Sequence, residues 1–180
     1  MKKNHLENII NAIGKLKDLK RSGWLARHVE LPESDADHSF GVAFLVMMLA
    51  PGDVDKLKCL EMALVHDLAE IYTGDYTPYD KISKADKCRL EKDASLRIAN
   101  ELCWDKLIDL VAEYNKGETR ESRFVKLLDK LETLMSAKYY DDNKRAPETL
   151  LSEFGESAKV YAKKYNDPDL AEVRDIINSF

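Results

Sequence analysis

Apolar residues recur at intervals of three and four along most of this 180-residue chain, and that spacing restricts the possible folds more than any other feature. In the first twenty residues they form one stripe, made of Leu6, Ile9, Ile10, Ile13, Leu16 and Leu19. The chain has seven glycines and no run in which β-branched and polar residues alternate, as they do in a half-buried strand. The pattern therefore predicts an all-α fold.

Capping and turn residues divide this pattern into successive helices. The predicted elements are a first helix to about Leu19, a loop over 22–34, a second helix from Ser34 or Asp35 to Pro51, a third from Asp53 or Asp55 to Thr73, a loop over 73–82, a fourth helix from Ser83 to about Cys103, a short fifth from Asp105 to near Gly117, a long sixth from Thr119, and two or three final helices around Pro147 and Pro168. No repeat or low-complexity linker separates them. We predict a single domain over residues 1–180, with the C-terminal helices of 147–180 packing on the rest and adding no chemical signal.

Charge, hydropathy and cysteine usage exclude several classes of partner. A net charge of −5 disfavours a general binder of nucleic acid polymers, which would carry a basic surface. No apolar run approaches the roughly 20 residues that span a bilayer, so we expect no membrane partner. Cys59, Cys88 and Cys103 form no CxxC pair, which favours a reduced, cytoplasmic compartment.

The pair His66–Asp67 interrupts the apolar run of residues 62–71. Two strongly polar side chains in a segment predicted to be buried are unfavourable unless partners satisfy them. Imidazole nitrogen and carboxylate oxygen are both good ligands for divalent metal ions. The other candidates in reach of such a site are His38, Glu70, Asp75 and Asp129.

On a continuous helix His66 and Glu70 share one face, and Asp67 is rotated by about 100° from His66. One ion can therefore meet both His66 and Asp67 only in a groove between helices, which His38 and Asp129 could complete. Two imidazoles and two carboxylates without a thiolate suit one Mn, Co, Fe, Ni or Zn ion, and suit Mg less well.

Each of these residues also has a purely structural interpretation when taken alone. His38 or His66 could be a satisfied core histidine, and Asp129 could pair with Lys126 or Lys130 on its own helix. Asp75 could be a turn residue. Their order and spacing together favour the metal site, beside which a spare carboxylate could orient water or handle a leaving-group proton.

Five sequence blocks resemble the HD-domain metal-dependent phosphohydrolases, and in particular their 5′-deoxynucleotidase branch. The blocks are Arg21-Ser22-Gly23-Trp24, Glu33-Ser34-Asp35-Ala36-Asp37-His38, Ala63-Leu64-Val65-His66-Asp67-Leu68-Ala69-Glu70, Gly74-Asp75 and Phe124-Val125-Lys126-Leu127-Leu128-Asp129-Lys130, within about residues 15–140. The resemblance implies an HD-type helical bundle, usually a homodimer, that removes the 5′-phosphate from deoxynucleoside 5′-monophosphates. It implies the metal ligands His38, His66, Asp67 and Asp129, and the catalytic carboxylates Glu70 and Asp75.

The resemblance also implies substrate contacts by Arg21, Trp24, Thr77 and Pro78. Trp24 would lie beside the sugar, where a tight fit disfavours a ribose 2′-hydroxyl, although it could simply pack against the first helix. Bacterial members have an arginine directly before the tryptophan, whereas this chain has glycine there. The phosphate contact therefore falls to Arg21, with Arg27 as the alternative.

Two other functions remain open at this stage. The protein could use the same site to hydrolyse a nucleoside triphosphate or a guanosine alarmone, although the chain lacks an obvious Lys/Arg-rich cradle for several phosphates. The chain could instead be a nucleotide- or metal-sensing domain without turnover, although such a domain has no evident use for both Glu70 and Asp75. The resemblance also implies a single-metal site, because two-metal members of the HD superfamily need additional histidines between the His-Asp pair and the final aspartate, and none of the four histidines here follows His66.

Overall fold

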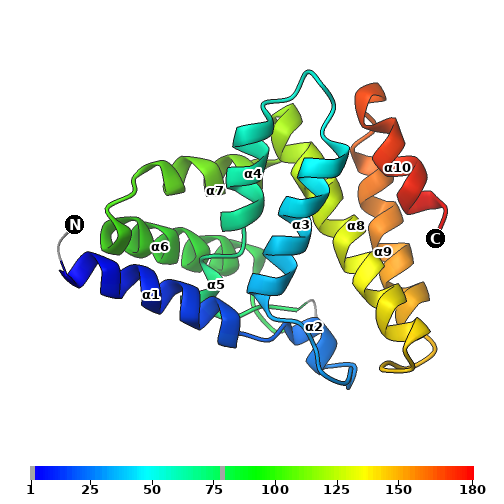
Figure 1. The fold of residues 1–180 in the computed structure, drawn as a ribbon, viewed down its shortest axis with the longest axis horizontal. Coiled ribbons are helices and arrows are strands. Elements are labelled where there is room, and N and C mark those ends of the chain that lie inside the picture. The colour runs from blue at the N-terminus through cyan, green and yellow to red at the C-terminus, as the bar shows by residue number, and fades with distance from the viewer. Residues whose placement is uncertain (1–2, 78–79) are drawn as a thin grey trace.

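The computed structural model describes residues 3–77 and 80–180, and it consists of packed helices (Figure 1). In chain order they are α1 (Lys3–Asp18), α2 (Ser22–Leu25), α3 (Asp35–Leu49), α4 (Lys56–Val65), α5 (Glu70–Thr73), α6 (Lys84–Leu102), α7 (Lys106–Lys116), α8 (Arg120–Asp142), α9 (Leu150–Lys164), the 3-10 helix η1 (Pro168–Leu170) and α10 (Ala171–Asn178). An isolated bridge joins Lys20 to Ser34, and the described residues form no strand. The predicted all-α fold is confirmed. Within the two described ranges, no helix combines the length and the apolar composition of a membrane span.

The long helix α8 packs against α3 and α4 on one side and against α9 and α10 on the other (Figure 1). The apolar side chains that α8 buries among these neighbouring helices are Phe124, Val125, Leu127, Leu128, Leu131 and Leu134. Because neighbours cover it on two sides, α8 also buries the polar residues Asp129 and Glu132. Burial of such groups requires partners, and those partners define the candidate site described below.

Side-chain caps begin the helices near the positions that the sequence predicts. Ser34 caps α3 in a capping box with Asp37, in which each side chain accepts a hydrogen bond from the other residue's backbone amide. Asp55 caps α4, Ser83 caps α6 and Thr119 caps α8. The capping box fixes the start of α3, so His38 lies in its first turn.

The predicted third helix is wrong in its second half, because α4 ends at Val65 and α5 begins only at Glu70. Residues 66–69 form a tighter turn, in which the amide of Glu70 donates to the carbonyl of Asp67 at 2.9 Å. A bond between residues three apart turns the chain more sharply than an α-helix does. The directions of the polar side chains in this segment therefore differ from those on a continuous helix.

The predicted loop over 22–34 is also wrong in its first four residues, which form α2. The carbonyl of Arg21 accepts hydrogen bonds from the amides of Trp24, at 3.1 Å, and Leu25, at 3.2 Å. Periodicity cannot detect a helix of one turn. Burial of Trp24, which is 1% exposed, holds this turn against the fold.

Candidate metal centre and its cavity

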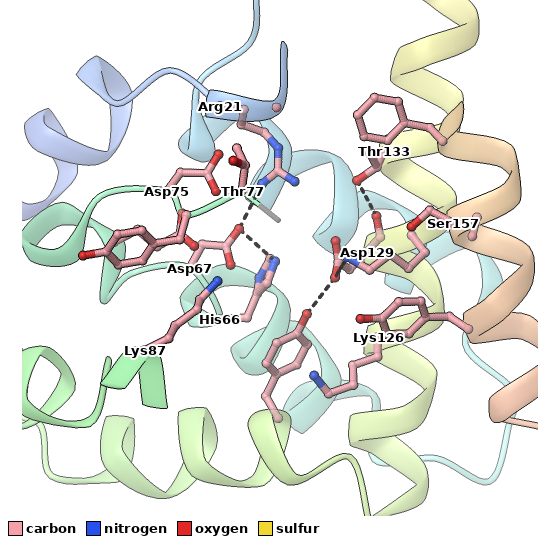
Figure 2. Close-up of a pocket in the computed structure, with 18 of the residues that line it drawn as sticks. Arg21, His66, Asp67, Asp75, Thr77, Lys87, Lys126, Asp129, Thr133 and Ser157 are labelled. Atoms are coloured by element: carbon pink, nitrogen blue, oxygen red, sulfur yellow. Dashed lines mark hydrogen bonds and ion pairs between the residues drawn. The ribbon is translucent and has the colours of Figure 1, made fainter. Parts of the chain in front are cut away.

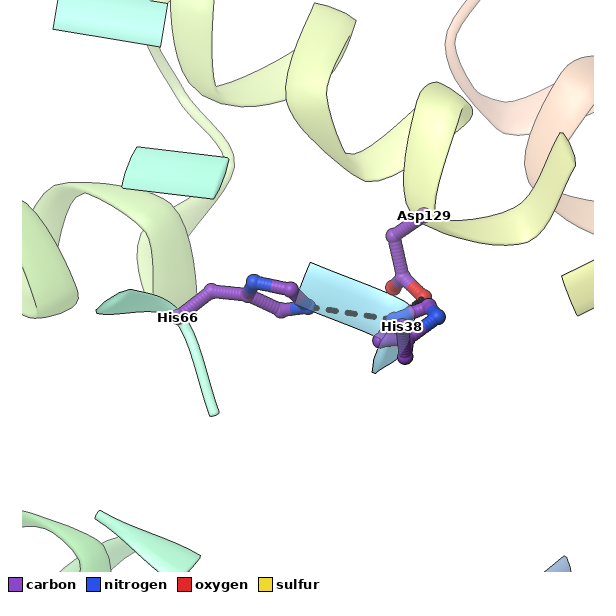
Figure 3. A group of neighbouring side chains, drawn as sticks. All are labelled: His38, His66 and Asp129. Carbon is purple, nitrogen blue, oxygen red and sulfur yellow. Dashed lines mark hydrogen bonds and ion pairs between the residues drawn. The ribbon is translucent and has the colours of Figure 1, made fainter. Parts of the chain in front are cut away.

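Four of the side chains selected from the sequence converge where α3, the α4–α5 turn and α8 meet. Nε2 of His38 lies 3.4 Å from Nε2 of His66 and 3.4 Å from Oδ1 of Asp129 (Figure 3). It lies 3.9 Å from Oδ2 of Asp67. Nε2 of His66 lies 3.3 Å from the same Asp67 oxygen. Ligands about 2.0–2.2 Å from one ion are at most about 4.4 Å apart. His38, His66 and Asp129 form a group with ligand atoms all within 4.8 Å of one another, whereas Asp67 lies near both histidines but is not part of that group.

Both imidazole rings are held by their other nitrogen. Nδ1 of His66 donates to the carbonyl of Ala63 at 2.9 Å, and Nδ1 of His38 forms a hydrogen bond with Oε2 of Glu132. A proton on Nδ1 leaves the lone pair on Nε2, which is the atom that faces the cluster in each ring. Both histidines are therefore oriented as metal ligands.

The electrostatics of the cluster favour a cation. Burial and the charge of Arg21 lower the pKa of His38, but Glu132 and Asp129 outweigh them and raise it to about 9. Burial opposes ionisation of Asp129, yet Lys130 and His38 hold its pKa well below the usual range. The carboxylates that raise the pKa of His38 would equally attract a metal cation, which would take the place of a proton on Nε2.

Asp129 has partners of its own beyond the two histidines. The hydroxyl of Tyr114 donates to its Oδ2 at 2.8 Å, and Nζ of Lys130 lies 3.0 Å from the same oxygen. The hydroxyl of Thr133 donates to the Asp129 backbone carbonyl at 3.0 Å (Figure 2). The salt bridge that a structural interpretation predicted is thus present, and Oδ1 faces the cluster at the same time.

The two candidate arginines occupy different surroundings. Nη1 of Arg21 lies 3.2 Å from Oδ2 of Asp67 (Figure 2). It lies 3.8 Å from Oδ1 of Asp35. Arg27 lines the same cavity, but its Nε donates to Glu153 at 2.8 Å. Arg21 is therefore the arginine that contacts the cluster.

The further carboxylates predicted at the site lie beside Asp67. Asp35, Asp67 and Glu70 each place an oxygen within 4.8 Å of the other two. Burial, together with the charges of Asp67 and Asp75, raises the pKa of Glu70 to about 12, and its Oε2 has no hydrogen-bond partner among the described residues. Oδ2 of Asp75 accepts from the amide of Ser22 at 2.6 Å, which ties the loop after α5 to α2. The expectation that Glu70 shares a helix face with His66 fails, because the helix is interrupted between them.

A cavity of about 430 Å³ opens beside the cluster. Of the residues predicted at the site, those that line it are Arg21, Trp24, His66, Asp67, Glu70, Asp75, Thr77 and Asp129. The ring of Trp24 packs against Phe154, at 4.5 Å between centroids, and its Nε1 donates to Glu33 at 2.8 Å. Trp24 is thus a packed wall residue, held by Phe154 of α9 and Tyr140 of α8. Pro78 lies outside the described residues.

Several lining residues were missed from the sequence. Lys126 of α8 and Ser157 of α9 are two of them (Figure 2). Lys130 of α8 and Tyr161 of α9 line the cavity as well. The lysines are three residues before and one residue after Asp129, so their proximity could have been inferred. The α9 residues carried no such signal in the sequence. The C-terminal helices pack on α8, and α9 in addition forms part of the cavity wall.

The chain matches the HD domain family over residues 13–167, and it belongs to that family. Among its relatives, 5′-deoxynucleotidase HDDC2 of Dictyostelium discoideum is 42% identical over 149 residues, which are 77% of this chain and 78% of that protein. The human protein of the same name is 35% identical over 171 residues, covering 93% and 82%. The crystal structure of the PH0347 protein from Pyrococcus horikoshii superposes with a TM-score of 0.76 at 32% identity, covering 97% of this chain and 96% of that one. The predicted HD-type helical bundle is confirmed.

Proposed function

We propose that this protein is a metal-dependent phosphohydrolase that removes the 5′-phosphate from deoxynucleoside 5′-monophosphates. The observation that carries the proposal is the convergence of two oriented imidazoles and two carboxylates beside Arg21, at the wall of a 430 Å³ cavity. A cavity of this size suits a small molecule such as a nucleotide. The name 5′-deoxynucleotidase, which relatives up to 42% identical carry, supports the choice of substrate.

In this proposal His38, His66, Asp67 and Asp129 hold one divalent cation. When bound, such an ion polarises a phosphoryl oxygen and lowers the pKa of water. The mixed nitrogen and oxygen donors suit Mn, Co, Fe, Ni or Zn better than Mg.

The protein's own charged groups then bind the phosphate and move protons. Arg21 can form two parallel hydrogen bonds to the non-bridging phosphate oxygens, because its guanidinium already faces the cluster. Glu70 holds a proton readily, since burial and the neighbouring carboxylates raise its pKa. Glu70, with Asp75 beside it, can therefore exchange a proton with the attacking water or with the leaving 5′-oxygen. Trp24, Thr77 and Pro78 remain the proposed contacts to the nucleoside.

The test is the release of inorganic phosphate from deoxy- and ribonucleoside mono- and triphosphates, each with Mn, Co, Zn or Mg. We expect turnover of deoxynucleoside monophosphates with the transition metals. Asp129→Asn should abolish it, whereas Asp142→Asn, an exposed carboxylate at the end of the same helix, should not. Wild-type protein that releases no phosphate from any monophosphate would refute the proposal. Preferential turnover of triphosphates would favour the alternative substrate class.

We also propose that the protein acts as a homodimer. Helix α3 exposes a run of large apolar side chains, namely Phe40, Phe44, Met47 and Met48, each more than half exposed. Such a patch on one helix is typical of a protein–protein interface. Light scattering on wild type and on Phe44→Glu tests this: a dimeric wild type and a monomeric variant are expected, and a monomeric wild type would contradict it.

We infer a cytoplasmic location as well. Cys88 and Cys103 are exposed and free, and Cys59 is buried and free. Exposed thiols of this kind persist in a reducing compartment. Fractionation of cells that produce the chain would test the inference, and recovery from an oxidising compartment would contradict it.

A further inference from the structure

A second buried carboxylate lies on α8 close to one helical turn beyond Asp129. Glu132 is 8% exposed, and its Oε2 forms a hydrogen bond with Nδ1 of His38. The opposite nitrogen of that ring, Nε2, is the atom 3.4 Å from both His66 and Asp129. We propose that Glu132 is a positioning residue, which orients His38 and strengthens it as a metal ligand. The proposal rests on the metal site of the proposed function.

Glu132 acts from outside the substrate cavity. It lines a second cavity, of about 890 Å³, whose described lining shares no residue with the 430 Å³ cavity. The carboxylate therefore reaches the cluster through the imidazole of His38 and does not meet a substrate in the first cavity. Its effect on the reaction is indirect, through the histidine.

Neighbouring groups hold the carboxylate in place. Its other oxygen, Oε1, accepts a hydrogen bond from the Ser136 hydroxyl at 3.1 Å, and the same hydroxyl lies 3.0 Å from Oε2 of Glu33. On the opposite side Glu132 lies directly against α3, where a methyl group on Gly41 would come within 2.7 Å of Oε1. Both oxygens thus have defined partners, and glycine at position 41 leaves room for the close approach.

This arrangement has a specific consequence for metal binding. A carboxylate that accepts the Nδ1 proton keeps the lone pair on Nε2, fixes the rotation of the ring and increases its basicity. A glutamine can still accept the hydrogen bond but carries no charge, and alanine provides neither. Affinity for the metal should therefore fall in the order wild type, Glu132→Gln, Glu132→Ala.

The experiment measures Mn²⁺ binding by calorimetry on chelator-treated protein. We expect about tenfold weaker binding for Glu132→Gln and up to about 100-fold for Glu132→Ala. The control, Glu156→Gln, changes a carboxylate on α9 that is 81% exposed, and it should bind as wild type does. In phosphate release, excess Mn²⁺ should restore the rate of Glu132→Gln, and KM for the nucleotide should not change.

Unchanged Mn²⁺ affinity in both Glu132 variants would overturn the inference. So would a loss of affinity that merely follows loss of the folded state, measured by urea unfolding without metal. Wild-type protein that binds Mn²⁺ but hydrolyses no nucleotide would refute the proposed function and leave this inference intact if the Glu132 variants bind more weakly. Wild-type protein that binds no Mn²⁺ would overturn both.

Discussion

Replacing Arg21 by glutamine is the substitution that most directly separates the two candidate phosphate ligands. Nη1 of Arg21 lies 3.2 Å from Oδ2 of Asp67, and the two side chains are 15% and 16% exposed. At an effective dielectric constant of about 20, unit charges at that distance attract by about 5 kcal/mol. Removing one partner of such a pair costs about 3–5 kcal/mol of unfolding free energy, because the other charge stays buried.

The same substitution should impair catalysis more than it impairs folding. If Arg21 donates to the phosphate as its charge develops, its loss should lower kcat by about 10²–10³-fold. The matched control is Arg27→Gln. Arg27 pairs with Glu153, which is 45% exposed, so this pair contributes at most about 1 kcal/mol to the unfolding free energy. Arg27→Gln should therefore change stability or kcat by no more than about fivefold.

Two assays decide the question. Phosphate release from a deoxynucleoside monophosphate with Mn²⁺ gives kcat and KM for both variants. Urea unfolding with and without metal gives their stability, and bound metal should recover part of the loss in Arg21→Gln because a cation compensates the charge of Asp67. An equal or larger loss of activity in Arg27→Gln, or a metal-free Arg21→Gln as stable as wild type, would refute the reasoning.

Three further substitutions test the surroundings of the site. Tyr114→Phe removes the hydroxyl that donates to Asp129 at 2.8 Å. It should lower the unfolding free energy of metal-free protein by about 1.5–3 kcal/mol. An unchanged midpoint in urea titrations would contradict this prediction. Burial lowers the pKa of Lys126 from 10.5 to about 8, so the unfolded chain binds the lysine proton more tightly than the folded protein does. As the pH rises across that interval, the unfolding free energy of wild type should therefore increase relative to that of Lys126→Met. The prediction is wrong if urea titrations at both ends of the interval give the same difference in unfolding free energy between wild type and Lys126→Met. Asp167→Ala removes two hydrogen bonds from Arg123, of 2.8 and 2.7 Å. It should lower the unfolding free energy by about 1 kcal/mol and leave kcat and KM unchanged. A loss of activity would contradict a purely structural role for this pair.

Local features of the chain predicted most of the helices correctly. Ser83 and Thr119 cap α6 and α8 as expected, and Pro168 lies in the first turn of η1. These signals work because a cap acts on backbone groups only two or three residues away. The break after Val65 had no such signal, since apolar periodicity continues through the turn.

The candidate ligands could also be identified from the sequence, because metal chemistry limits them to a few residue types and the motif order is distinctive. Convergence of His38, His66 and Asp129 within 4.8 Å agrees with that identification. The role of Glu132 could not be identified in this way. Its hydrogen bond to His38 joins residues 94 positions apart, and neither spacing nor composition predicts that contact.

The sequence by itself determined that this chain forms amphipathic helices and carries a donor set for a divalent cation, because helical period and ligand chemistry belong to individual residues and their near neighbours. Only the tertiary structure decided which nitrogen of each imidazole faces the cluster, that Arg21 rather than Arg27 contacts it, and that α9 forms part of the cavity wall. The reason is physical: these properties depend on hydrogen bonds and packing between helices that are distant along the chain, and a buried polar group takes whichever partner the fold places beside it.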